Sequence, residues 1–425
     1  MPGKINRKAG YLEATATDID PEHKVVTCEP VVCDADSCDI HDFTVEYDRL
    51  IITIGAQTNT FGIPGVDEHC YYLKQISDAR RIRTSIVNCF ERASLPNLPE
   101  EEKISNLTFA VIGAGPAGIE FAAELRDFVE QDGTKYYPNL LKYVRIKVIE
   151  AATTILAPFD KSLQDEAIKQ LNRQVEIKDA EVRKLLPPRF KLVELVLSSS
   201  VKEVTDSTIY LNDGTCLPYG VAVWAAGNGP LPLTIQLIEK LGEEQAKEKT
   251  NARGRIATDP WMRAIGSNGS ILAFGDCSYT ITGSLPVTAQ VASQQGEYLA
   301  RLMNKQYDMS PPKTEDGALP PPIRNPDVAG FSLSDVIASY STKTNEYAKP
   351  FQFLNLGILA YTGGGSALAQ VATLPEAKPL KGKGKIGNML WKGVYITKQV
   401  SWRNRLLVLN DWAKRQMFGR DITQL

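Results

Sequence analysis

The chain has 425 residues, of which 43% are hydrophobic and 23% are charged. This composition is ordinary for a globular chain of two or three domains, and it excludes global disorder, a collagen-like fibre and a coiled-coil rod. The formal net charge of −2 does not indicate a nucleic-acid-binding protein, and seven cysteines are too few for a disulfide scaffold. No apolar stretch reaches the roughly 18 residues that span a bilayer. The first residues lack the apolar region of a secretory signal, so none is expected.

The first hundred residues indicate β-structure followed by one helix. Segment 24–32 is short and rich in β-branched residues, which favours a strand. Segment 44–56 begins with alternating residues and ends in a continuous apolar run, which is typical of a strand buried on both faces. Segment 75–93 repeats apolar residues about every 3.6 positions and therefore predicts an amphipathic helix.

A predicted strand at 107–113 runs into a glycine-rich turn and then into a predicted helix at 119–131. The turn has the GxGxxG spacing of a dinucleotide-binding loop. In such a loop Gly113 permits the tight turn, Gly115 lets backbone N–H groups approach a pyrophosphate, and Gly118 lets the helix pack close to the strand. The phosphates then lie at the positive N-terminus of the helix. The sequence therefore predicts a nucleotide site here.

Glu150 ends a second predicted strand at 144–150, which completes a βαβ unit. A carboxylate at this position can accept hydrogen bonds from the adenosine ribose and repels a 2′-phosphate, which favours NADH over NADPH. The polar segment 130–143 accounts for the long spacing from the glycines as an insertion. The alternative is an ordinary carboxylate at a strand end. For Glu120, near the helix start, interaction with the helix dipole and a place beside the nicotinamide remain equal alternatives.

The next segments add helices and strands before a second glycine-containing turn. Residues 160–185 are predicted to be helical, and 199–227 predicts small antiparallel strands that close on a buried strand. A strand ending in Gly275 and Asp276 can aim a carboxylate at a sugar-alcohol hydroxyl while the glycine lets a cofactor approach. The helix predicted at 286–305 would direct its N-terminus at a flavin edge, where its positive end stabilises the reduced anionic form. A plain strand–turn–helix is the alternative.

The end of the chain differs in charge and pattern from the rest. Residues 306–350 are rich in Pro, Asp and Ser and predict a loop or insertion. The segment 378–425 carries a surplus of nine positive charges, which leaves −11 for the remainder. It predicts two helices, and one face of the second collects Trp402, Leu406, Leu409 and Ala413. Such a helix can lie in a bilayer interface, although docking on the protein's own core or on a second subunit is the alternative.

Three cysteines recur at intervals of five near the N-terminus. Cys28, Cys33 and Cys38 are flanked by His23 and His41. The spacing matches neither the usual structural zinc pattern nor a calcium loop. We expect a surface hairpin here, and no metal.

Several motifs occur in the order found in one known family. These motifs are 51-IITIGAQTNTFGIPGV-66, 111-VIGAGPAGIEFAAEL-125, 258-TDPWMR-263, 274-FGDC-277, 288-TAQVASQQGEYLA-300, 399-QVSWRNRLLVLNDW-412 and 418-FGRD-421. Together they resemble the type II NADH:quinone oxidoreductases, the alternative, rotenone-insensitive NADH dehydrogenases of mitochondria. The resemblance covers most of the chain except about 180–200 and 306–350.

The resemblance implies an α/β flavoprotein with two Rossmann-like dinucleotide-binding domains. The FAD-binding domain would comprise 1–75 and 250–305, and the NADH-binding domain 76–249. A loop or insertion would occupy 306–350, and an amphipathic membrane-anchoring region 351–425. The family begins with a further strand–GxGxxG–helix that holds the ADP part of FAD, so the FAD-binding domain is expected to be N-terminally incomplete.

The resemblance also implies site residues. NADH would be held by Gly113, Gly115, Gly118, Glu120 and Glu150, and FAD would lie at Gly55, Gly275, Asp276 and Ala289. Neighbouring cofactor-binding positions are Ala114, Pro116, Gly227 and Ala56. The quinone pocket would be lined by Gln290, Ser293 and Gln294, and the catalytic residues would be Glu120 and Gln290.

The activity implied is electron transfer from NADH through FAD to ubiquinone, without proton pumping, by a peripheral protein of the mitochondrial inner membrane. A homodimer through the tail is left open. Two rival functions remain at this point: a soluble NADH-dependent flavin reductase of another small acceptor, and a non-catalytic NADH-binding protein.

Overall fold

The computed structural model describes residues 10–31, 41–177, 179–315, 317–324, 347–371, 380–399 and 401–420. Two compact units are present: unit 1 comprises 1–57 and 228–354, and unit 2 comprises 58–227 and 355–425. This division differs from the borders expected after residues 75 and 249, and it places the C-terminal region in one unit with the glycine-rich turn. Which cofactor each unit binds stays a prediction.

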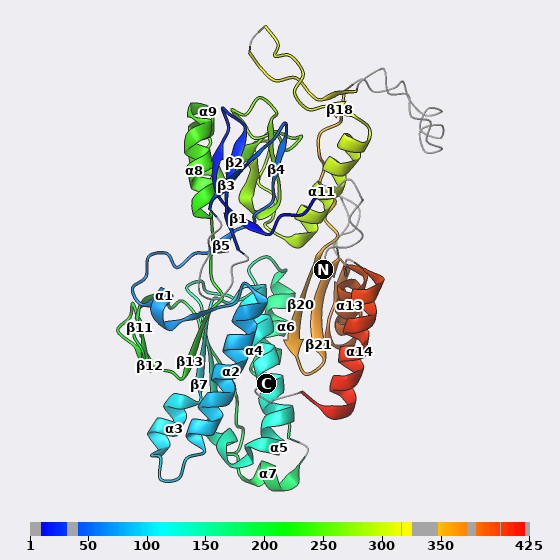
Figure 1. The fold of residues 1–425 in the computed structure, drawn as a ribbon. Helices are drawn as coiled ribbons and strands as arrows, with labels where there is room; N and C mark the ends of the chain where they lie inside the picture. The colour runs from blue at the N-terminus through cyan, green and yellow to red at the C-terminus, as the bar shows by residue number, and fades with distance from the viewer. Residues whose placement is uncertain are drawn as a thin grey trace. The chain divides into compact units, whose positions relative to one another are not determined.

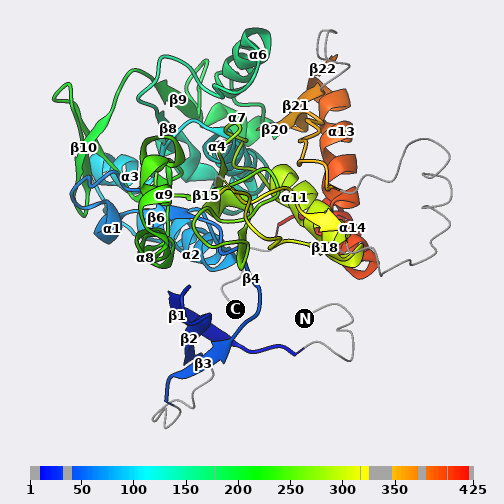
Figure 2. The same ribbon diagram turned by 90° about the horizontal axis from the view of Figure 1, so that it is seen from above.

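Unit 1 contains small sheets rather than one large one (Figure 1). An antiparallel sheet consists of β1 (Ala14–Asp20), β2 (Val25–Pro30) and β3 (Phe43–Glu46), which lie side by side in Figure 2. Parallel pairs are formed by β4 (Leu50–Ile52) with β16 (Ile271–Ala273) and by β15 (Ile256–Thr258) with β17 (Ser278–Thr280). Short β5 (Gln57–Thr58) pairs with β14 (Asn228–Gly229).

The expectation that the apolar run 50–54, at the end of segment 44–56, forms a strand buried on both faces is wrong. The segment forms the short strands β3 and β4, and the side chains of Ile51 and Ile54 are 42% and 40% exposed. A strand is buried on both faces only where other elements cover both faces of its sheet, and among the described strands β4 belongs to a sheet of two strands only. Apolar composition alone does not report what covers a strand.

Helices cover the strands of unit 1. They are α8 (Pro232–Leu241), α9 (Glu243–Lys247), α10 (Lys249–Ala252), the 3₁₀ turn η3 (Gly275–Cys277) and α11 (Ala289–Asn304). Within the predicted loop 306–350, β18 (Tyr307–Asp308) pairs with β19 (Ile323–Arg324). The buried guanidinium of Arg263 donates to the backbone carbonyls of Met309 and Pro320, which anchors this segment. Residues 325–346 lie outside the described residues.

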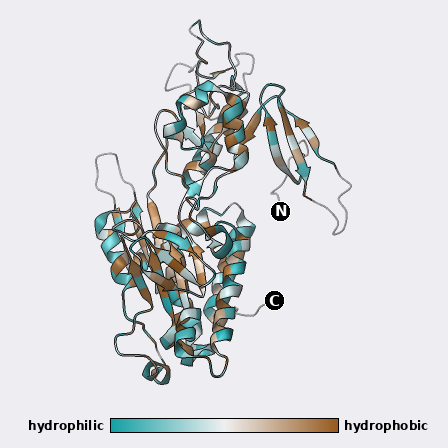
Figure 3. Ribbon diagram, turned by 90° about the vertical axis from the view of Figure 1, so that its left-hand side faces the viewer, coloured by the Kyte–Doolittle hydropathy of each residue, from teal (hydrophilic) through white to brown (hydrophobic). Residues whose placement is uncertain are grey.

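Unit 2 is built on a five-stranded parallel sheet in the order β6–β13–β7–β8–β9. Its strands are β6 (Tyr71–Tyr72), β7 (Thr108–Ile112), β8 (Arg145–Ile149), β9 (Val193–Val196) and β13 (Val221–Trp224). Every residue of β7 and β13 is buried, as expected for parallel strands covered on both faces. Hydrophobic strands of this kind are coloured brown in Figure 3. Phe90, Phe109 and Ile119 are completely or almost completely buried in the core beside this sheet.

The remaining elements of unit 2 surround that sheet. The helices are α1 (Val66–His69), α2 (Ile76–Ala93), α3 (Glu100–Asn106), α4 (Pro116–Phe128), η1 (Val129–Gly133), α5 (Thr134–Tyr136), η2 (Pro138–Tyr143), α6 (Lys161–Leu171) and α7 (Ala180–Lys184). A small antiparallel sheet consists of β10 (Val201–Val204), β11 (Thr208–Leu211) and β12 (Cys216–Pro218). The expected antiparallel strands in 199–227 are therefore present.

The C-terminal region packs on α4 (Figure 1, orange and red). It consists of the antiparallel strands β20 (Ile358–Gly363), β21 (Ser366–Val371) and β22 (Leu380–Gly382), and of the helices α13 (Gly384–Thr397) and α14 (Trp402–Phe418). Strand β20 contacts α4, and α13 contacts β21. Among the described helices, none is long and apolar enough to cross a bilayer.

Candidate functional site

The glycine-rich turn follows buried β7 and opens α4. Gly113 has a φ of +106°, and a Cβ there would lie 2.9 Å from the backbone nitrogen of Ala226. A Cβ on Gly118 would lie 1.9 Å from the backbone oxygen of Gly113. Both positions therefore require glycine, the first for its left-handed backbone and the second for the close approach of helix and strand.

Gly115 differs from its two neighbours in the motif because nothing lies within 4 Å of where its Cβ would be. It is the N-cap of α4, with Pro116 in the first turn, and no side chain caps this helix end. Pro116 is suited to that place because the first turn needs no partner for a backbone N–H. The turn therefore offers free space beside a helix N-terminus that no side chain caps, which suits a pyrophosphate.

Glu150 reaches back to this turn from the end of β8. Its Oε2 accepts a hydrogen bond from the Ala114 backbone N–H at 2.7 Å, and its Oε1 accepts one from Ala152 at 2.9 Å. The side chain is half-buried. Two backbone donors thus fix the carboxylate beside the turn, at the place where a ribose diol would follow the pyrophosphate.

Gly227 lies after β13, next to the same turn in the sheet. Its φ is +73°, and a Cβ would lie 2.7 Å from the ring of Phe61 and 2.8 Å from the Asn59 oxygen. The backbone nitrogen of the preceding residue, Ala226, lies 2.9 Å from where a Cβ on Gly113 would be. The structure thus brings Gly227 close to the GxGxxG turn, although the two are more than a hundred residues apart in sequence.

Glu120 does not point to solvent at the helix start. Its Oε1 accepts hydrogen bonds from the Tyr361 backbone N–H at 3.0 Å and from the indole N–H of Trp391 at 3.3 Å. Burial raises the pKa of this carboxyl above its ordinary value. Its partners lie in the C-terminal region, and no local sequence pattern indicates either of them. A catalytic role for Glu120 stays a prediction.

The flavin-side residues predicted in unit 1 lie on two glycine turns. Gly55 has a φ of +75° with nothing within 4 Å of its Cβ position, and it is followed by half-buried Ala56. Gly275 has a φ of +76°, and half-buried Asp276 follows it. The Gly275 backbone N–H donates to Oε1 of buried Gln295 at 2.9 Å, a contact that sequence reasoning missed.

The predicted quinone residues lie on the first turns of α11. Thr288 caps this helix by accepting a hydrogen bond from the Val291 backbone N–H at 3.4 Å, and Ala289 follows it, exposed. The Gln294 amide donates to the Leu354 oxygen at 2.8 Å and accepts from the Leu354 N–H at 2.9 Å. Gln294 therefore holds the chain at Leu354, whereas Gln290 is half-buried and Ser293 is exposed.

The residues predicted to bind FAD suit one end of this cofactor, the end that carries the flavin ring. Gly55 is left-handed with open space beside it, whereas a Cβ on left-handed Gly275 would lie 3.4 Å from the Ala292 methyl group. These glycines, and the Asp276 carboxylate after the second one, suit the approach of a flavin and its sugar-alcohol chain. A second strand–GxGxxG–helix for the ADP end does not occur among the residues that the structure describes. Gly55, Gly275 and Asp276 are thus the part of the expected FAD site that can be placed.

The cysteine and histidine segment is described only in part. Cys28 is buried on β2, whereas Cys33 and Cys38 lie outside the described residues. His23 pairs with Asp20 at 2.9 Å, which raises the pKa of the imidazole. In the described part of the chain, no group of three or more His, Cys, Asp or Glu side chains could hold a metal ion.

The two C-terminal helices present apolar side chains outward. On α14, Trp402 and Leu406 are 76% and 64% exposed, and Leu409 is exposed as well. Trp412 of the same helix packs inward, and its ring stacks on Trp391 of α13 with centroids 6.4 Å apart. Further exposed apolar residues on α13 are Ile386, Met389, Leu390 and Val394. Both helices are therefore amphipathic, with an inner face that packs and an outer apolar face that does not.

Comparison with known proteins gives consistent matches over the whole chain. Residues 3–296 match the pyridine nucleotide-disulphide oxidoreductase family, and residues 355–421 match the NDH2 C-terminal domain, which begins where unit 2 resumes after Leu354. The external alternative NAD(P)H-ubiquinone oxidoreductase B1 of Solanum tuberosum mitochondria is 30% identical, over 99% of this chain and 80% of the relative.

Two further relatives agree with this match. The mitochondrial external NADH-ubiquinone oxidoreductase 2 of Saccharomyces cerevisiae is 34% identical, over 99% of this chain and 70% of the relative. The solved structure of NDH2 from Plasmodium falciparum in complex with NADH has the same fold, with a TM-score of 0.75 and 24% identity over 97% of this chain and 85% of that one. The predicted α/β flavoprotein fold is confirmed, and the chain belongs to the type II NADH:ubiquinone oxidoreductases within the pyridine nucleotide-disulphide oxidoreductase family.

Proposed function

We propose that this chain transfers two electrons from NADH, by way of FAD, to ubiquinone at the mitochondrial inner membrane, without pumping protons. Family membership supports this activity over reduction of another small acceptor, since the two relatives are named mitochondrial NAD(P)H-ubiquinone and NADH-ubiquinone oxidoreductases. The observation that carries the proposal is the built nucleotide turn, where Gly115 leaves open space and Glu150 binds the Ala114 N–H.

Different residues at the turn would bind different parts of NADH. The backbone amide groups after Gly115 would bind the pyrophosphate, and the helix dipole of α4 would favour its negative charge. Glu150, already held by two backbone donors, would accept the ribose hydroxyls without having to reorganise. Its negative charge would oppose the 2′-phosphate of NADPH. This arrangement supports NADH as the electron donor.

FAD, when bound, supplies a ring that accepts a hydride and releases electrons to a second acceptor. Gly55 and Gly275 would allow its close approach, and the Asp276 carboxylate would bind a hydroxyl of its sugar-alcohol chain. Gln295 holds the Gly275 turn through the backbone N–H. Gln290 and Ser293, on the first turns of capped α11, would contact the quinone, whereas Gln294 is engaged with Leu354.

Attachment to the membrane would use the outer apolar faces of α13 and α14. Exposed Trp402, Leu406 and Met389 are the type of side chain that enters a bilayer interface, and nearby Lys and Arg would add attraction to anionic headgroups. A homodimer through the same faces is the competing proposal. Flotation with anionic vesicles distinguishes membrane attachment from dimer formation. Leu406→Glu should reduce vesicle binding if this face is membrane-bound. It should instead change the sedimentation coefficient without vesicles if the face is a dimer contact.

The decisive experiment measures NADH oxidation by the full chain with a water-soluble ubiquinone analogue. Gly115→Val fills the open space but creates no backbone strain, because the φ of Gly115 is −68°. We expect loss of NADH binding with an unchanged melting temperature. Gly10→Val, at an exposed glycine that also has nothing within 4 Å, is the matched control and should keep full activity. Unchanged NADH oxidation in Gly115→Val would contradict the proposal, and acidification of a vesicle lumen by the purified chain would contradict the absence of pumping.

A further inference from the structure

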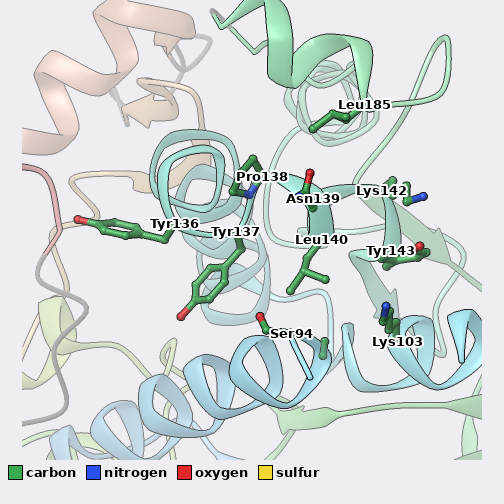
Figure 4. Close-up of a pocket in the computed structure, with 11 residues that line it drawn as sticks. Ser94, Lys103, Tyr136, Tyr137, Pro138, Asn139, Leu140, Lys142, Tyr143 and Leu185 are labelled. Carbon is green, nitrogen blue, oxygen red and sulfur yellow. The ribbon is translucent and has the colours of Figure 1, made fainter. Parts of the chain in front are cut away.

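A cavity of about 530 Å³ lies in unit 2 and includes no residue of the glycine-rich turn. Figure 4 shows the side chains that line it, which come from the end of α2, from α3, from the end of α5 and the residue after it, from η2 and from the end of α7. Its size falls within the range of small-molecule sites in proteins. Nothing in the proposed electron transfer uses this cavity.

One side of the cavity is cationic. The ammonium groups of Lys103 and Lys142 lie 5.8 Å and 4.8 Å from the centroid of the Tyr143 ring, which stands between them in Figure 4. Tyr143 is buried, and its hydroxyl donates to Glu100 at 2.6 Å, so the ring is held in place. Lys142 lies 3.7 Å from the same carboxylate, whereas Lys103 makes no ion pair within the described residues.

The other side of the cavity is apolar with polar edges. Leu140, Leu185 and the ring of Tyr137 form part of its wall. One face of the Tyr137 ring stacks on Phe90, with centroids 4.8 Å apart and planes at 23°, which makes this wall rigid. Exposed Asn139 lies at the edge and can both donate and accept hydrogen bonds.

We propose that this cavity is a second nucleotide site, distinct from the NADH turn, which takes a nucleoside phosphate such as ADP. Two flexible ammonium groups suit a phosphate chain, because Lys binds phosphate as a mobile point charge. A flat nucleobase suits the apolar wall of Leu140, Leu185 and Tyr137. Asn139 could form hydrogen bonds with the edge of that base. This assignment rests on residues other than those of the proposed function. A soluble nucleotide could then bind the chain at a site separate from the NADH turn.

The test is isothermal titration of the full-length Gly115→Val chain with ADP, since this background blocks the turn. We expect one bound ADP per chain. Replacing both lysines, Lys103→Gln and Lys142→Gln, should weaken its binding about tenfold or more, because charge-assisted contacts to phosphate are lost. The matched control is Lys135→Gln. This lysine lies on α5 next to the lining residue Tyr136 but does not itself line the cavity, so the variant should bind ADP as before.

Further titrations show whether the cavity binds the phosphate groups, the base or both parts of ADP. Inorganic pyrophosphate and adenosine should each bind more weakly than ADP. Leu185→Asp, at an exposed position of the apolar wall, should weaken ADP binding but leave the fold intact. Absence of ADP binding in Gly115→Val, or equal binding after loss of both lysines, would overturn the proposal. Equal affinity for pyrophosphate and ADP would also overturn it, because the cavity would then be a phosphate site without a base site. None of these outcomes depends on NADH oxidation, so failure here is distinct from failure of the proposed function.

Discussion

One glycine turn follows a strand in each unit, β7 in unit 2 and β4 in unit 1, and the two turns require glycine for different reasons. In unit 2, Gly118 is enclosed, because a Cβ there would lie 1.9 Å from the Gly113 oxygen. In unit 1, Gly55 has open space around it and requires glycine for its backbone, with a φ of +75°. The first turn is thus fixed by packing of a helix on a five-stranded sheet, and the second by local conformation. The comparison predicts that replacing a glycine by alanine lowers the free energy of unfolding by different amounts in the two turns.

The largest effect is expected for Gly118→Ala. The added methyl group cannot be accommodated without moving α4 away from β7, and overpacking of this kind costs about 3 kcal/mol or more. The free energy of unfolding, measured in urea by circular dichroism, should fall accordingly. Gly115→Ala is the matched control in the same turn and should change stability by less than about 1 kcal/mol. Equal losses for the two variants would show that packing does not fix this turn.

A comparable effect is expected where the C-terminal region joins α4. Buried Asp127 accepts hydrogen bonds from the Tyr361 hydroxyl at 2.6 Å and from the Gly364 N–H at 2.8 Å. Asp127→Ala leaves both donors unpaired and should cost about 2–3 kcal/mol. Limited proteolysis should then release the region after residue 355. Asp165→Ala, which removes an exposed pair with Lys161, should have no measurable effect.

A smaller effect is expected for Gly55→Ala. Because nothing lies within 4 Å, the cost is conformational only, about 1–2 kcal/mol for a left-handed residue. Gly55→Asn should cost less, since Asn adopts this conformation more readily. Thermal unfolding of both variants measures the difference. A loss as large as that of Gly118→Ala would mean that the two turns are built alike.

The smallest effect concerns pH and Glu120. Burial raises its pKa in the folded chain above the ordinary value of 4.5, so the folded state binds a proton more tightly than the unfolded state. This group therefore contributes stability at low pH, and the contribution is lost as the pH rises from 4.5 through the raised folded pKa. The stability of Glu120→Gln relative to the natural chain should increase over this range, as followed by melting temperature. A decrease would show that the ionised form is the one favoured by Tyr361 and Trp391.

Much of unit 2 could be predicted because its signals are local. Strand β7, the spacing of Gly113, Gly115 and Gly118, and the amphipathic pattern of α2 each depend on neighbours in sequence. The two C-terminal helices were predicted for the same reason. The contacts of Glu120, Gln294 and Gln295 could not be predicted, because their partners lie at residues distant in sequence. The exposure of Ile51 could not be predicted either, because it depends on which elements cover the faces of the small sheet that contains β4.

The sequence by itself determined the nucleotide turn, the acidic residue that ends the next strand and the family to which the chain belongs, because these reside in short motifs of fixed spacing. Only the tertiary structure decided that residues 355–425 form one unit with that turn, through Asp127 and Glu120. Only the fold, too, shows that Lys103, Lys142 and Leu185 line one cavity. These arrangements depend on burial and on hydrogen bonds between distant segments, which no local pattern of residues encodes.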